Sequence, residues 1–203
     1  KTAYEISLGL VGSEMCIRDS CSTVEREIAF GLENLGLPRE EIIFRIDEAL
    51  HLMGIEHLRY SSPEELSGGE QQKVAIAACL AMKPKILVLD EPTAHLDPAS
   101  ALRLFKTLEK LNRDLDIAIL LIEHRLDMVA EIADRVIIMH EGKILTDGSP
   151  EQAFAQKMVR DIGIGIPKVM KLYMELKEAG LALGKPPITP DELKQQLEVL
   201  LKR

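Results

Sequence analysis

Two acidic residues, Asp90 and Glu91, follow directly after a short apolar run and are well placed to do chemistry. The run is Ile86–Leu89, and its residues do not alternate with polar ones, which is typical of a strand buried on both faces of a parallel sheet. Open α/β sheets bind ligands where their strands end, and a carboxylate there needs a cation, a hydrogen bond or a task. The pair indicates phosphoryl transfer, in which Asp90 would hold Mg²⁺ and Glu91 would orient the attacking water.

A second segment, twenty residues upstream, supplies a complementary element for binding an anion. Ser67 is expected to cap a helix, whose first backbone N–H groups point outward. Gly68 and Gly69 have no Cβ that would keep an anion away. We therefore expect the start of this helix to receive a phosphate group.

A second apolar run, Ile117–Ile122, is followed by Glu123 and His124, as the first run is followed by its two acids. If both runs are strands of one parallel sheet, they deliver their polar residues to the same edge. The sequence thus predicts one site there. The sheet and the helices expected between its strands place the chain in the α/β class.

The order of these segments resembles the ATP-binding subunit of ABC transporters. LSGGEQQ at 66–72, ILVLDEPT at 86–93, HLD at 95–97 and the pair at 123–124 match the signature motif, Walker B, D-loop and switch histidine of that family. The segments around Ile28–Gly36 and Glu123–Asp127 are most similar to ATPases of energy-coupling-factor importers for vitamins and for cobalt or nickel. The resemblance covers about residues 21–203 and is most specific from Leu66 to His124.

This resemblance implies a catalytic pair, Glu91 as base and His124 as sensor of the γ-phosphate, beside Asp90 as the Mg²⁺ residue. It further implies a cofactor-binding set that contacts ATP across two subunits: Ser67, Gly68 and Gly69 on the γ-phosphate, and Asp97 of the D-loop as an intersubunit contact. His95 is expected to be a loop surface residue.

The implied fold is the C-terminal part of a P-loop NTPase domain with a parallel-sheet core. Its expected parts are a helical subdomain at 21–66, the ATPase core at 67–150 and a small helical extension at 151–203 that helps two ATPase subunits pair. Implied cofactors are ATP and Mg²⁺. Implied partners are a second ATPase subunit, identical or paralogous and arranged head to tail, and integral membrane transporter subunits, with the chain peripheral on the cytoplasmic face of the membrane.

Residues 1–20 depart from the family pattern. The chain contains no G-x-x-x-x-G-K-[ST] motif, since its Gly-Lys pairs at 142–143 and 184–185 are followed by Ile144 and Pro186. The segment Gly12–Ser20 matches no family segment that we can place. We interpret residues 1–20 as foreign to the family, from a sequencing or assembly junction, with a divergent but genuine leader as the alternative. We expect the 203-residue chain alone to hydrolyse ATP negligibly.

The composition of the chain argues against some classes of function. The net charge is −8, which argues against a nucleic-acid-binding surface, because phosphate contacts are made mostly by Lys and Arg. Three cysteines without a C-x-x-C pair are typical of a reducing cytosol. No apolar run approaches the ~18 residues of a membrane span. With 46% hydrophobic and only 3% aromatic residues, the core is expected to be aliphatic.

Two other functions stay open at this stage. One is a soluble ABC ATPase of DNA repair or translation, although such proteins usually carry insertions or tandem cassettes. The other is a non-catalytic partner module that uses its signature helix and tail only for association. Neighbouring genes for a membrane protein would favour transport, and an upstream P-loop would argue against the module.

Local patterns predict the remaining elements. Helices are expected over about 23–35, 39–53, 98–112 and 169–179, and a hairpin over 136–145. Three serine or threonine residues before a proline, Ser62, Ser149 and Thr189, are expected to cap helices, the first two of them in capping boxes.

Overall fold

A computed structural model describes residues 8–12, by backbone alone, and residues 22–201. The chain divides after His124 into two compact units. The first unit contains every site residue predicted from the sequence, and the second begins at Arg125. The predicted limits of the helical subdomain, core and extension stay predictions.

The sheet of the first unit is parallel, as expected. Its order is β1 (Leu8–Gly12), β2 (Ile86–Asp90) and β3 (Ala118–Ile122). Both pairings run in continuous register, with Asp90 opposite Gly12 on one side and Ile122 on the other. Strand β1 falls within residues 1–20, where the sequence analysis predicted no strand.

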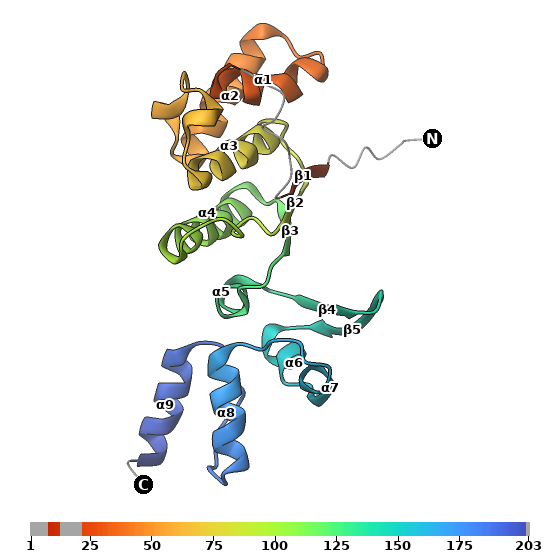
Figure 1. The fold of residues 1–203 in the computed structure, drawn as a ribbon, viewed down its shortest axis with the longest axis vertical. Coiled ribbons are helices and arrows are strands. Elements are labelled where there is room, and N and C mark those ends of the chain that lie inside the picture. The colour runs from red at the N-terminus through yellow and green to blue at the C-terminus, as the bar shows by residue number, and fades with distance from the viewer. Residues whose placement is uncertain (1–7, 13–21, 202–203) are drawn as a thin grey trace. The chain divides into compact units, whose positions relative to one another are not determined.

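Three helices of the first unit pack together around aliphatic side chains: α1 (Val24–Asn34), α2 (Arg39–Met53) and α3 (Gly68–Ala81). They pack on one another (Figure 1), and each presents buried aliphatic side chains to the others. Helix α2 ends at Gly54, whose φ of 63° lies in the left-handed region that glycine adopts without strain.

Arg59 joins the connection after α2 to two of these helices. Its guanidinium donates to Glu25 of α1 at 2.6 Å and also to Asp47 of α2. Glu25 first, and Asp47 second, raise the pKa of Arg59 above its ordinary value. Short 3-10 turns at Glu56–Leu58 and Pro63–Glu65 complete the path to α3.

Helix α4 (Pro98–Leu115) packs against β3. Five of its apolar residues are buried at helical spacing, as the sequence predicted: Ala101, Leu104, Phe105, Leu108 and Leu111. Strand β2 has fully buried Leu87 and Leu89. Strand β3 is less buried than β2, because Leu120 and Ile122 are exposed.

The three predicted caps, two of them predicted as capping boxes, have three outcomes. Thr189 accepts from the N–H of Glu192, whose carboxylate accepts from Thr189 in return. Ser149 accepts from the N–H of Gln152, but its hydroxyl donates to Glu151, so the reciprocal bond is missing. The prediction for Ser62 is wrong: it makes no side-chain cap bond, because the segment after it is a three-residue 3-10 turn that ends at Glu65.

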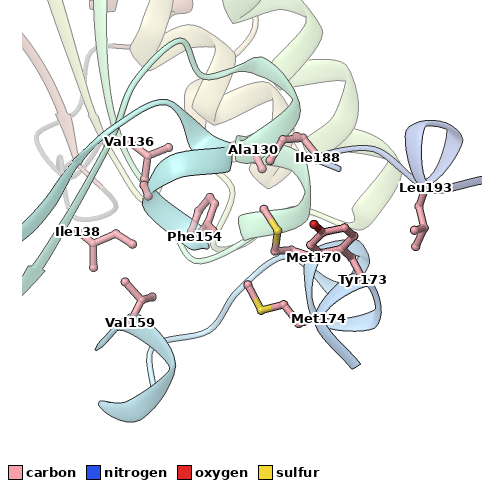
Figure 2. Close-up of a cluster of buried hydrophobic side chains, with 11 residues drawn as sticks. Ala130, Val136, Ile138, Phe154, Val159, Met170, Tyr173, Met174, Ile188 and Leu193 are labelled. Atoms are coloured by element: carbon pink, nitrogen blue, oxygen red, sulfur yellow. The ribbon is translucent and has the colours of Figure 1, made fainter. Parts of the chain in front are cut away.

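The second unit begins with α5 (Leu126–Ile132) and the antiparallel hairpin of β4 (Val136–His140) and β5 (Lys143–Gly148). Helices α6 (Pro150–Phe154), α7 (Lys157–Asp161), α8 (Lys168–Glu178) and α9 (Pro190–Leu201) follow. Phe154, Met170 and Tyr173 lie at the centre of its core (Figure 2). The predicted hairpin and the predicted α8 are confirmed, and none of the described helices is long and apolar enough to cross a membrane.

Replacement of Phe105 by alanine should destabilise the first unit. The ring is 1% exposed under the sheet, so its loss leaves a cavity and should lower the free energy of unfolding by about 3–5 kcal/mol. Leu102→Ala on the same helix is the control, because Leu102 is 43% exposed and should cost under about 1 kcal/mol. Urea titration of the helical circular dichroism measures both, and equal losses would contradict the assigned burial.

Candidate functional site

The parallel register of β2 and β3 creates a polar edge, which we define as residues 90–97 after β2 together with Glu123 and His124 after β3. Asp90 lies opposite Ile122, and the next backbone N–H, that of Glu91, donates to the carbonyl of Ile122 at 2.9 Å. The two loops therefore leave the sheet side by side. The predicted convergence of both loops on one edge is confirmed.

Glu91 and His124 meet at this edge. His124 Nε2 lies 2.9 Å from Glu91 Oε1, and the two side chains are 83% and 41% exposed. Glu91 has a φ of 47°, in the left-handed region that costs a residue with a Cβ some strain. The turn after β2 thus holds the Glu91 backbone in an unfavourable conformation while its carboxylate faces the histidine.

Thr93 and Glu123 form a second link between the loops, which the sequence analysis did not predict. Glu123 Oε1 accepts from the backbone N–H of Thr93 at 3.1 Å and from the Thr93 hydroxyl. Glu123 Oε2 accepts from the N–H of His124 at 3.0 Å. Thr93 is completely buried. The sequence feature that could have indicated this link is Glu123 itself, an acid directly after a strand and next to His124.

Asp90 is exposed at the end of its strand and carries a carboxylate, the kind of ligand that Mg²⁺ prefers. Among the described residues no group of three or more acids, histidines and cysteines could hold a metal by itself. Mg²⁺ sites of nucleotide enzymes do not need such a group, because one or two carboxylates suffice when phosphates and water supply the other ligands. Asp90 fits that donor set.

Ser67 caps the start of helix α3, as the sequence predicted, and Ser67 and Glu70 form a reciprocal capping box there. Ser67 Oγ accepts from the N–H of Glu70 at 3.4 Å, and the Glu70 carboxylate accepts from the Ser67 N–H at 2.9 Å and from its hydroxyl at 2.6 Å. These bonds, the hydroxyl first, lower the pKa of Glu70 from its ordinary 4.5. The box therefore stabilises the fold above that value and loses its effect as the pH falls through the lowered pKa.

The two glycines at the start of α3 are not required by the fold of this chain. A Cβ on Gly68 would lie 3.7 Å from the carbonyl oxygen of His95, and one on Gly69 would lie 3.7 Å from a methyl of Leu96. Both are ordinary contacts, and neither glycine has a positive φ. The contacts also place the start of α3 against the loop that follows β2. A requirement for glycine here must come from something outside the chain.

Asp97 has a local role in addition to the predicted one. Its Oδ1 accepts from the N–H groups of Ala99 at 2.9 Å and Ser100 at 3.0 Å, so it caps α4. Hydrogen bonding to the Ser100 side chain first, and then to the backbone N–H groups of Ser100 and Ala99, lowers the pKa of Asp97. Its part in a contact between subunits stays a prediction. His95 is exposed, as expected of a loop surface residue.

Comparisons with known proteins agree with the motifs. The ABC transporter family model matches residues 2–94. The energy-coupling factor transporter ATP-binding protein EcfA1 of Caldanaerobacter subterraneus is 42% identical over 171 residues, which are 84% of this chain and 61% of the relative. EcfA of Methanoculleus marisnigri is 40% identical over 182 residues, 89% of this chain and 66% of the relative.

Solved structures agree as well. CbiO1 of Clostridium perfringens, described as part of the ABC transporter complex CbiONQ, superposes with a TM-score of 0.63 at 36% identity, over 77% of this chain and 61% of that protein. The chain spans about half to two thirds of the length of its curated relatives, from 49% to 66%. With the motif order, the polar edge and these likenesses together, the chain belongs to the ABC transporter ATP-binding family and is similar to ATPases of energy-coupling-factor transporters.

Proposed function

We propose that this chain is part of the ATP-hydrolysing subunit of an energy-coupling-factor importer, and that ATP binding closes it onto a second ATPase subunit. The observation that carries the proposal is the contact of His124 with Glu91 at the carboxyl edge of a parallel sheet. Such an edge is where nucleotides bind in open α/β folds. An acid and a histidine in contact there are suited to act on a phosphoryl group and its attacking water.

The start of α3 would bind the γ-phosphate of ATP held by the other subunit. Its outward N–H groups and helix dipole favour an anion, and the absence of a Cβ at Gly68 and Gly69 allows close approach. The Glu70 carboxylate now occupies the hydrogen-bonding positions of Ser67. Phosphate binding would therefore replace one anion at this helix start with another.

The polar edge would act on a nucleotide held by a P-loop of the same polypeptide. Asp90 would hold Mg²⁺, which when bound neutralises charge on the phosphates. Glu91 would accept a proton from the attacking water, and His124 would hydrogen-bond the γ-phosphate. In the proposed pair, each ATP site combines the P-loop of one subunit with the start of α3 of the other. The 203 residues contain no P-loop motif, so they supply the α3 part of such a site.

The implied assembly is a head-to-tail pair of ATPase subunits, bound peripherally to integral membrane subunits on the cytoplasmic face of the membrane. Similarity to EcfA proteins and to CbiO1, which is described as part of a transporter complex, supports the association with membrane subunits. The acidic net charge of −8 disfavours the alternative of an ATPase acting on DNA or ribosomes. The alternative of a non-catalytic module predicts no turnover even when a P-loop is supplied.

We expect the 203-residue chain alone to hydrolyse ATP negligibly, and a chimera with the P-loop segment of Methanoculleus EcfA fused ahead of Cys21 to be active. Glu91→Gln in the chimera should lower kcat by about 10²-fold or more, because a general base contributes that much. Glu109→Gln on α4 is the matched control, since Glu109 is exposed and pairs with Arg113. Phosphate release measures all four proteins. Full turnover by the Glu91→Gln chimera would refute the role of Glu91.

Ser67→Arg should abolish ATP-dependent pairing. An arginine side chain at the start of α3 would fill the space into which the phosphate must fit. Sedimentation with a hydrolysis-deficient, P-loop-bearing EcfA subunit should show the Kd in Mg-ATP weakened at least about tenfold, which is about 1.4 kcal/mol.

The control for this experiment is Ser149→Arg. Ser149 caps α6 with the same 3.4 Å bond to an N–H three residues on, so it carries a similar stability cost away from the phosphate position. Equal weakening by both variants would argue against a phosphate site at Ser67.

A further inference from the structure

The side chain of Glu123 bonds to both loops of the polar edge. The backbone hydrogen bond from Glu91 N–H to the Ile122 carbonyl continues the β2–β3 pairing to the start of these loops. The Glu123 carboxylate adds a bridge farther out, since one of its oxygens takes both donors of Thr93 and the other takes the N–H of His124. The carboxylate therefore determines how far the loop after β3 lies from the loop after β2.

The contact between His124 and Glu91 has little else to hold it. The His124 side chain is largely solvent-exposed, so packing does not fix its rotamer. Thr93, in contrast, is completely buried and gives Glu123 a rigid anchor. Hydrogen bonds to an ionised acceptor are roughly twice as strong as neutral ones, which makes this bridge a suitable support for an exposed side chain.

We propose that Glu123 is a positioning residue, which fixes His124 against Glu91 by tying the start of the histidine loop to Thr93. The role of this positioning in catalysis rests on the proposed function. The predicted geometry does not. A shorter side chain would not span the two loops. Glutamine would keep the oxygen that faces Thr93 but would turn an NH₂ group, a donor, toward the N–H of His124.

The test uses nuclear magnetic resonance of the full 203-residue chain, without nucleotide, in the variants Glu123→Ala and Glu123→Gln. Glu123→Ala should speed hydrogen exchange of the Thr93 and His124 amides by about tenfold or more. It should also abolish the nuclear Overhauser effect between the His124 ring and the Glu91 side chain. Glu123→Gln should leave the Thr93 amide protected while the His124 amide loses its protection.

The strand amides of Leu89 and Leu121 are the internal control, because both lie inside the β2–β3 ladder. They should be unchanged, and Glu109→Ala should change none of these signals. The proposal is overturned if Glu123→Ala leaves the His124 to Glu91 effect intact. It is equally overturned if the strand amides lose protection together with Thr93, since Glu123 would then be a general stabiliser of the sheet.

A second measurement separates this inference from the proposed function. In the P-loop chimera, Glu123→Ala should lower kcat by roughly 10–100-fold, the effect of a misplaced catalytic group, with KM for ATP unchanged. A rise in KM at unchanged kcat would overturn the positioning role. If the parent chimera is inactive, the proposed function fails, and the exchange and Overhauser measurements still decide whether Glu123 positions His124.

Discussion

The parallel hydrogen bonding of β2 with β3 is the constraint on which the rest of the site depends. Because Asp90 pairs with Ile122, the residues that follow the two strands emerge at the same height and on the same edge. The His124 to Glu91 contact and the Thr93 to Glu123 bridge both follow from that register. A slip by one residue would turn each side chain to the opposite face and would separate all four groups.

The start of α3 depends on the same loop. Gly68 and Gly69 lie against His95 and Leu96, so the segment after β2 bonds to β3 on one side and contacts the signature helix on the other. Asp97 then caps α4 and ends the loop. One short, well-bonded segment thus connects the helix start proposed to bind the γ-phosphate held by the other subunit with the acids proposed to act on a nucleotide held by the same polypeptide, within the first compact unit.

Much of this could be predicted because the signals were local. The apolar run before Asp90, the Ser67 cap and the spacing of α4 each depend on neighbouring residues. The Thr93 to Glu123 bridge could not be predicted, because it joins residues thirty apart and needs the register first. Ser62 shows the limit of local rules: its pattern matches a capping box, but the segment closes as a 3-10 turn. The exposure of Leu120 and Ile122 on β3 likewise depends on which elements pack against the strand, and the residues of the strand do not determine that.

The most direct test of the composite site replaces Mg²⁺ with paramagnetic Mn²⁺ in ATP bound to a hydrolysis-deficient EcfA partner. The ¹⁵N-labelled 203-residue chain is then added. If the start of α3 lies on the partner's γ-phosphate, the amide signals of Gly68, Gly69 and Glu70 should broaden strongly. Sharp signals at the start of α3, with the two proteins shown to be associated, would contradict the account.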